Sequence, residues 1–241
     1  MSRVHLDVSA AVAVVTLDHP PLNIYDLAMR EELIEVFGAA RDHPDARVVV
    51  LAAAGAHFSA GADLSQFGTA ESIFEARRIR WWRDPWSALL DSPKPSVAAL
   101  HGYALGAGFE MALMCDFRVA TADVKVGLPE TKLGMLPSAG GSQTLTRLLG
   151  AGRALPIVLE GRTYDAEDAL RLGVVDEVVS DADAAARQWA SRLADLEPAA
   201  ARAAKLALRA ATDLPLSVGL AEERRLAAGL QPRSSMSRTA R

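Results

Sequence analysis

Short apolar runs alternate with amphipathic segments along most of the chain. Val4–Val8 and Ala11–Leu17 are rich in β-branched residues and predict two strands. Arg47–Ala52 is a nearly continuous apolar run, which is typical of a strand buried on both faces. Over Asp26–Ala40 the apolar residues recur with a helical period, and Asp26 is placed to cap that helix. The pattern therefore predicts an α/β fold.

The second half of the chain repeats this alternation and then becomes helical. A helix is predicted over Glu71–Leu90. The further predicted strands are Ser96–Leu100, Asp116–Ala120 and Val124–Val126. The Ala-rich remainder, from Asp181 to about Leu230, predicts helices only, and residues 231–241 have the Ser- and Arg-rich composition of a disordered tail. A strand, strand, helix unit thus recurs and gives way to an all-helical end.

Composition narrows the class of protein. The 241 residues are half apolar and carry a formal net charge of −4, so nucleic acid is not an expected partner. The single cysteine, Cys115, excludes an internal disulfide, and the N-terminus lacks the apolar segment of a signal peptide. Lys94, Glu110 and Asp116 interrupt the best candidate for a membrane span. We expect a soluble cytoplasmic protein, and the scattered histidines predict no metal site.

Two glutamates carry the candidate chemistry. Glu110 lies in an apolar run directly after the small residues Gly106–Gly108, and Glu130 follows Pro129. Small residues allow a tight turn whose N–H groups can face a ligand, and a carboxylate is costly to bury without a reason. Two carboxyl groups beside free backbone donors suit acid–base chemistry on a polarised carbonyl. The structural alternatives are an ion pair with an arginine for Glu110 and a helix-start position for Glu130.

Several stretches occur in an order and at separations that resemble one family, the enoyl-CoA hydratase/isomerase (crotonase) family. They are Phe58–Leu64, His101–Glu110, Leu128–Glu130, Leu133–Gly134 and Pro137–Gln143. The resemblance runs from the N-terminal strands to about Leu230. It implies an α/β, crotonase-like spiral of ββα units over residues 1–190. A helical trimerisation region, 191–230, and the tail, 231–241, would follow.

The resemblance also implies a substrate and residue roles. The substrate is an acyl-CoA thioester, whose coenzyme A is part of the substrate, with no separate cofactor and no metal. By position, the backbone N–H groups of Ala62 and Ala107 match the family's oxyanion hole. Glu110 matches the glutamate that orients and activates water, and Glu130 the one that supplies the proton to C2. The residues matched to substrate and CoA binding are Ala60, Gly61, Asp63, Leu64, Ser65 and Gly106.

Some of these residues also have simpler interpretations. Asp63 suits a helix cap better than a ligand contact, and His57 and His101 suit local hydrogen bonds better than catalysis. Family members usually carry a further C-terminal helix pair, whereas this chain continues into the Ser- and Arg-rich stretch. We therefore expect its contacts with the CoA phosphates to differ from the family pattern.

The leading hypothesis is an enoyl-CoA hydratase, acting as a homotrimer or a dimer of trimers in fatty-acid β-oxidation. It would add water reversibly, with syn geometry, to a trans-2-enoyl-CoA and give a 3-hydroxyacyl-CoA. The presence of both Glu110 and Glu130 favours hydration, because many isomerases of the family keep only one such carboxylate. The alternatives are an enoyl-CoA isomerase or other enolate chemistry on the same scaffold, and a degenerate member that binds acyl-CoA without turnover.

Overall fold

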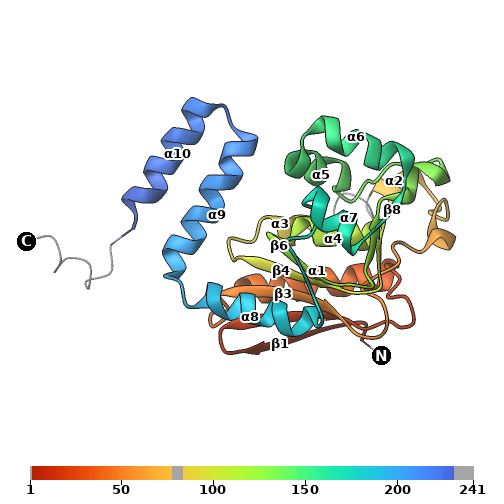
Figure 1. The fold of residues 1–241 in the computed structure, drawn as a ribbon, viewed down its shortest axis with the longest axis horizontal. Coiled ribbons are helices and arrows are strands. Elements are labelled where there is room, and N and C mark those ends of the chain that lie inside the picture. The colour runs from red at the N-terminus through yellow and green to blue at the C-terminus, as the bar shows by residue number, and fades with distance from the viewer. Residues whose placement is uncertain (1, 78–83, 231–241) are drawn as a thin grey trace, which may run out of the picture.

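A six-stranded sheet forms the centre of the body (Figure 1). The computed structural model describes residues 2–77 and 84–230. β1 and β2 pair antiparallel, and every later neighbour in the sheet pairs parallel. The strands, in sheet order, are β1 (Val4–Ser9), β2 (Val12–Leu17), β3 (Val48–Ala53), β4 (Ser96–Leu100), β6 (Phe117–Thr121) and β9 (Glu177–Val179). The strands predicted in these regions are confirmed to within a few residues.

Both faces of this sheet are covered by helices. Val49 and Leu51 of β3 pack in one apolar cluster, and Val48 and Val50 in another, because successive side chains point to opposite faces. α1 (Leu27–Asp42), α3 (Pro85–Leu90) and α4 (Ala107–Met114) contribute to the first cluster. α8 (Ala182–Ala194) covers the other face with a stripe of alanines four residues apart: Ala182, Ala186, Ala190 and Ala194. The sheet is therefore the middle layer of a three-layer core.

A second, three-stranded sheet explains how the ββα unit repeats. It consists of β5 (Tyr103–Leu105), β7 (Lys125–Gly127) and β8 (Thr163–Asp165). β4 is followed by β5 and then α4. In the same way β6 is followed by β7, the 3₁₀ helix η3 (Pro129–Leu133) and α5 (Gly141–Leu149). Each unit thus gives one strand to each sheet before its helix begins. The sequence analysis predicted no strand at Tyr103–Leu105, since so short a strand has no visible period of its own.

The helix predicted over Glu71–Leu90 is wrong as a single element. The structure has α2 over Ile73–Arg77 and a separate α3 that begins after Asp84. Asp84 is extended, and its side chain accepts a hydrogen bond from the backbone N–H of Trp86. A residue that precedes a proline disfavours the helical conformation, so Pro85 can start a helix but not continue one. Trp86 is buried, as a packing role for the tryptophans of this segment predicts, whereas Trp81 and Trp82 lie outside the described residues.

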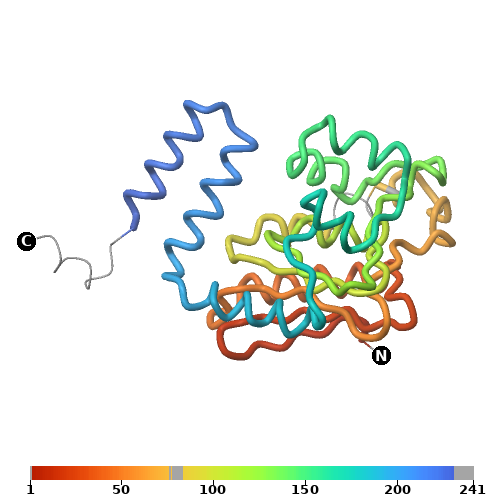
Figure 2. Tube along the Cα trace, viewed as in Figure 1, coloured from red at the N-terminus to blue at the C-terminus, as the bar shows by residue number. Residues whose placement is uncertain are grey.

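The C-terminal helices leave the body as a hairpin. α9 (Pro198–Asp213) and α10 (Leu216–Ala228) run side by side and stand to one side of the sheet (Figures 1 and 2). Lys205 of α9 is the buried contact: its Nζ donates to the Lys94 carbonyl at 2.7 Å and to Asp116 Oδ2 at 2.6 Å. α6 (Ala151–Glu160) and α7 (Ala166–Leu172) complete the body. The predicted tail, residues 231–241, lies outside the described residues.

Within residues 2–77 and 84–230, none of the helices has the length and apolar character that crossing a membrane requires.

Candidate active site

A glycine turn sets the start of α4. Gly106 has φ 51° and ψ −127°, a left-handed backbone that other residues rarely adopt, and its N–H donates to the Gly127 carbonyl at 2.9 Å. The helix that follows is buried along all eight residues. Ala107 is its first residue, so the Ala107 N–H has no acceptor within the helix. The turn therefore presents a backbone donor at the positive end of a buried helix.

The segment Ser59–Gly61 runs directly alongside this turn. The Ser59 N–H donates to the Tyr103 carbonyl at 2.8 Å, and the Leu105 N–H donates to the Ser59 carbonyl at 3.0 Å. A Cβ atom added to Gly61 would lie 2.9 Å from the Leu105 oxygen and 3.7 Å from the Ala107 nitrogen. Gly61, with φ 102°, is therefore required both by its backbone angle and by the closeness of the neighbouring chain.

The Ala62 N–H is oriented by a bridge to Tyr25. The Tyr25 N–H donates to the Gly61 carbonyl, and the Asp63 N–H donates to the Tyr25 carbonyl, both at 2.9 Å. Successive backbone groups of an extended segment point in opposite directions, so the Ala62 N–H faces away from Tyr25. Since Gly61 adjoins Ala107, the N–H groups of Ala62 and Ala107 lie on adjacent segments. The two segments to which the family resemblance assigns the oxyanion-hole donors thus run side by side.

Glu110 is buried on α4 and held by the loop before α5. Its Oε1 accepts hydrogen bonds from the backbone N–H groups of Ala139, at 2.9 Å, and Gly141, at 2.8 Å. A Cβ atom at position 141 would lie 2.7 Å from Glu110 Cγ, so that only glycine fits against this side chain. Sequence reasoning missed both donors; the adjacent glycines Gly140 and Gly141, directly before the helix, were the available signal. Two backbone donors fix one oxygen of the carboxylate in place.

Glu130 turns inward from η3 toward the same turn. A Cβ atom at Gly106 would lie 2.9 Å from Glu130 Oε1. Oε2 is buried and has no hydrogen-bond partner in the described part of the chain. Burial raises the pKa of Glu130, and a backbone hydrogen bond opposes part of that rise. The carboxyl group therefore lies against Gly106, four residues before Glu110, with one oxygen available to a ligand.

The remaining predicted site residues lie along the loop that runs from the buried Gly61 to the exposed Ser65. Gly61 is buried and Ala60 half-buried, and the Ala60 N–H donates to the Leu22 carbonyl at 2.9 Å. Asp63 caps the 3₁₀ helix η1 (Leu64–Gln66), because its Oδ1 accepts from the Ser65 N–H at 2.9 Å and from Ser65 Oγ at 2.7 Å. The prediction of a capping role for Asp63 is confirmed. Leu64 and Ser65 are exposed at the outer end of the loop.

Asn23 is a structural determinant of the site that the sequence did not reveal. It is fully buried, and its Nδ2 donates to the carbonyls of Ala54 and His57, both at 2.8 Å. Ser59 Oγ in turn donates to the Asn23 carbonyl at 2.7 Å. The Asn23 side-chain amide therefore holds both ends of the segment Ala54–His57, which leads into the Gly61 loop. His57 makes a hydrogen bond, as predicted: its Nδ1 accepts from the Tyr103 N–H at 3.2 Å, and its ring stacks on the Tyr103 ring.

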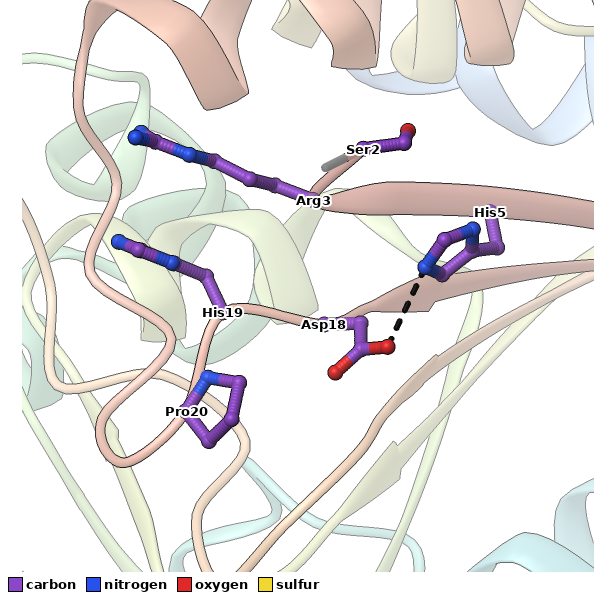
Figure 3. A pocket seen from close by; sticks show the side chains of 6 residues that line it. All are labelled: Ser2, Arg3, His5, Asp18, His19 and Pro20. Atoms are coloured by element: carbon purple, nitrogen blue, oxygen red, sulfur yellow. Dashed lines mark hydrogen bonds and ion pairs between the residues drawn. The ribbon is translucent and has the colours of Figure 1, made fainter.

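A separate surface pocket lies beside the N-terminal strands (Figure 3). Its lining residues are Ser2, Arg3, His5, Asp18, His19 and Pro20, and they include none of the predicted site residues. His5 Nε2 and Asp18 Oδ2 lie 3.2 Å apart across the pocket, and Arg3 pairs with Asp26 at the start of α1. Arg3, His5 and Asp18 thus already have side-chain partners. We therefore assign the chemistry to the α4 turn.

The two layered sheets, the ββα units and the helical C-terminus define a protein of the crotonase fold. Comparisons with known proteins agree. A family model described as enoyl-CoA hydratase/isomerase matches residues 7–240. The chain therefore belongs to the enoyl-CoA hydratase/isomerase family.

Individual relatives are similar along most of their length. A Mycobacterium tuberculosis protein named "Probable enoyl-CoA hydratase echA8" is 38% identical over 218 residues, which are 89% of this chain and 84% of that protein. The enoyl-CoA hydratase of Bacillus anthracis is 33% identical with a TM-score of 0.88, covering 95% of this chain and 91% of that chain. The enoyl-CoA hydratase of Thermoplasma volcanium is 29% identical with a TM-score of 0.88, covering 99% of this chain and 98% of that chain.

Proposed function

We propose that the protein is an enoyl-CoA hydratase. It adds water reversibly, with syn geometry, to a trans-2-enoyl-CoA and forms a 3-hydroxyacyl-CoA. The observation that carries the proposal is the placement of two glutamates beside the turn that presents the Ala107 N–H: the Glu130 carboxyl group lies against Gly106, and Glu110 is buried on the helix that the turn begins. Relatives named as enoyl-CoA hydratases support the same reaction.

The two backbone donors would bind the thioester oxygen. When water adds to the conjugated alkene, negative charge develops on that oxygen, and preorganised N–H groups stabilise it. Each such donor contributes about 3–4 kcal/mol to lowering a barrier of this kind. The donors at Ala62 and Ala107 belong to the backbone, so their geometry is fixed before the substrate arrives.

The two carboxyl groups would divide the work on one water molecule. Glu110, fixed by Ala139 and Gly141, orients the water and takes a proton from it as the oxygen bonds to C3; this proton then passes to Glu130 and restores the starting state. Glu130 supplies the proton to C2, and its burial, which raises its pKa, favours the protonated form that this role needs. The product gains one hydroxyl at C3 and one hydrogen at C2. No electrons are exchanged with a second molecule, so the proposal includes no cofactor beyond the CoA of the substrate.

We also propose that the helical hairpin assembles the chain into a trimer or a dimer of trimers. Large apolar side chains on α9 and α10 are exposed, among them Leu208 at 73% and Leu216 at 78%. Apolar groups gathered on one element are typical of a surface that another chain covers. The proposed setting is the hydration step of β-oxidation in the cytoplasm.

The test of the reaction follows the absorbance of the conjugated enoyl thioester after crotonyl-CoA is added to the pure protein. Glu110→Gln and Glu130→Gln should each lower kcat by about 10²–10⁴-fold, because each removes a proton-transfer group without changing the shape of the side chain. Glu167→Gln is the matched control, since the Glu167 side chain is 89% exposed on α7. Absence of hydration would refute the proposal, and turnover of a 3-enoyl-CoA alone would favour the isomerase alternative.

A further inference from the structure

Ser59 carries a fully buried hydroxyl group that has no step in the proposed reaction. The hydroxyl donates to the Asn23 carbonyl at 2.7 Å, and the Gly61 N–H donates to the same Oγ at 3.2 Å. One side-chain oxygen therefore joins the turn at Asn23 to the loop that contains Gly61. Ser59 precedes Ala62 in that loop, so its hydroxyl acts on the segment that presents one of the two proposed oxyanion donors.

The backbone of Ser59 is held against β5. Its N–H donates to the Tyr103 carbonyl at 2.8 Å, its carbonyl accepts from the Leu105 N–H at 3.0 Å, and the two segments form a parallel bridge at Ala104. β5 ends at Leu105, just before the turn that presents the Ala107 N–H. Ser59 is therefore fixed relative to the segment of the second donor as well.

The first turn of α4 packs directly on Ser59. A Cβ atom added to Gly108, the residue after Ala107, would lie 2.6 Å from the Ser59 carbonyl oxygen, 2.7 Å from Ser59 Cβ and 2.9 Å from Ser59 Oγ. Atoms at such distances overlap, so only a residue without a side chain allows this approach. One serine thus contacts both segments whose N–H groups would bind the thioester oxygen.

The Ser59 hydroxyl also limits the rotation of Gly61. Gly61 has φ 102°, and a backbone without a side chain can turn more freely than that of other residues. The Tyr25 N–H donates to the Gly61 carbonyl at 2.9 Å, which fixes the peptide unit after Gly61. The bond from the Gly61 N–H to Ser59 Oγ fixes the peptide unit before it. If Oγ is removed, this N–H loses its acceptor in a buried place, and the loop shifts to recover one.

We propose that Ser59 is a positioning residue that sets the distance and angle between the N–H groups of Ala62 and Ala107. The inference rests on the proposed function and adds to it the side chain that preorganises the oxyanion hole. Two donors stabilise the developing charge together only when both reach the same oxygen atom, at about 2.7–3.1 Å. A displacement of about 1 Å removes much of that stabilisation. Ser59 therefore acts on the reaction through the backbone, without touching the substrate.

The kinetic test compares two serines that make the same local bond. In Ser59→Ala we expect kcat for hydration of crotonyl-CoA to fall by about tenfold or more with KM nearly unchanged, because the displaced donors act in the transition state. Ser92→Ala is the matched control: Ser92 is 2% exposed, and its Oγ accepts from the N–H of Lys94, two residues later, at 3.3 Å. Ser92 precedes β4 whereas Ser59 follows β3, so the two serines lie beyond opposite ends of these parallel strands. Equal kcat values in the two variants would overturn the inference.

Thermal unfolding separates positioning from a purely structural role. Each variant removes the acceptor of one backbone N–H, so both should melt at a lower temperature than the wild type. A Ser59→Ala variant that melts lower but keeps full kcat would overturn the inference. If Ser59→Ala does not fold, Ser59→Cys takes its place, since sulfur accepts hydrogen bonds only weakly. Full kcat in the folded Ser59→Cys variant would likewise overturn the inference.

Infrared spectroscopy keeps the inference testable if no hydration occurs. Butanoyl-CoA labelled with ¹³C at the thioester carbon is a saturated analogue of crotonyl-CoA, and hydrogen bonds to its oxygen lower the carbonyl stretching frequency. We expect binding to lower this frequency in the wild type and in Ser92→Ala, and to lower it less in Ser59→Ala. That result supports the inference even where the hydratase proposal fails.

The other outcomes of the infrared experiment count against the inference. An equal shift in the wild type and Ser59→Ala overturns it while leaving the hydratase proposal to the kinetic assay. A wild type that binds butanoyl-CoA without any shift has no oxyanion hole for Ser59 to position, so the inference is wrong. If butanoyl-CoA does not bind, both proposals are wrong.

Discussion

The turn at the start of α4 and the α9–α10 hairpin differ in how far their side chains are buried within the chain. At the turn, Glu110 and Ala107 are buried, and the neighbouring segment 139–141 of the same chain holds the Glu110 carboxylate. On the hairpin, α10 has no buried residue, and exposed leucines face outward. Glu110 is thus held within one chain, while the hairpin leaves apolar side chains uncovered by the described part of the chain.

Glycine shows the difference most directly. A Cβ atom at Gly108 would lie 2.6 Å from the Ser59 carbonyl oxygen, and one at Gly141 would lie 2.7 Å from Glu110 Cγ. At Gly219 of α10 the nearest atom, the Ala210 oxygen, would be 3.9 Å away, an ordinary contact. Glycine at the turn therefore allows close approach, whereas in the hairpin it only weakens the helix.

The largest expected effect comes from making the same substitution in both regions. Gly141→Ala forces the Glu110 carboxylate out of its place, because the added methyl group would overlap Cγ and Oε1. We expect kcat for hydration of crotonyl-CoA to fall by about 10²-fold or more, since a shift of about 1 Å at a catalytic group has consequences of that size. Steady-state kinetics with the substrate at saturation measures the loss.

Gly219→Ala is the matched control in the hairpin. It should leave kcat unchanged and stabilise α10 by about 0.5–1 kcal/mol, because alanine is the better helix former. Thermal unfolding of both variants shows whether the fold is intact. A Gly141→Ala variant with full turnover would mean that Glu110 is not held as the structure shows, and the contrast between the regions would lose its basis.

Local sequence signals identified the residues that start elements and those that carry charge. Asp26 caps α1 and Asp63 caps η1, as expected from side chains that bond their own neighbouring backbone. Glu110 and Glu130 could be chosen because carboxyl groups in apolar or turn-forming surroundings are unusual. These features depend on residues close together in the chain, which a sequence displays directly.

The features that the sequence did not reveal depend on distant segments. Glu110 is held by Ala139 and Gly141, about thirty residues away, and Asn23 holds carbonyls at Ala54 and His57. Nothing local marks a backbone N–H as the partner of a remote side chain. Pro85 is a local signal for a break in the helix, but the helical period of the apolar residues around it favoured one continuous helix.

A smaller effect is expected where the hairpin meets another copy. Leu216→Asp should weaken assembly by about 1.5–3 kcal/mol per copy, the contribution of burying a leucine side chain. Sedimentation velocity should show the wild type as a trimer or hexamer and the variant shifted toward monomer at the same concentration. Leu170→Asp, at a residue 44% exposed on α7, is the control and should leave the mass unchanged. A monomeric wild type would contradict the proposed role of the hairpin.

The smallest expected effect is on the pH dependence of folding stability, which should have opposite signs in the two regions. Burial raises the pKa of Glu130 above its unfolded value of about 4.3, so the folded state binds more protons than the unfolded state between those two values. Stability is therefore lost as the pH rises through the raised pKa. Glu130→Gln should melt at a higher temperature than the wild type at pH 7, and the difference should disappear below about pH 4.

Glu222 of α10 supplies the opposite case. Its hydrogen bond with the Arg225 guanidinium is the main cause that lowers the pKa of Glu222, so its contribution to stability is present at neutral pH and is lost as the pH falls through the lowered pKa. Glu222→Gln should therefore melt slightly lower than the wild type at pH 7, and this difference should also disappear in acid. Melting curves from pH 3 to pH 8 test both signs together. If the two variants shift in the same direction at pH 7, Glu130 is not destabilised by its burial, and its proposed role as the proton donor loses its physical support.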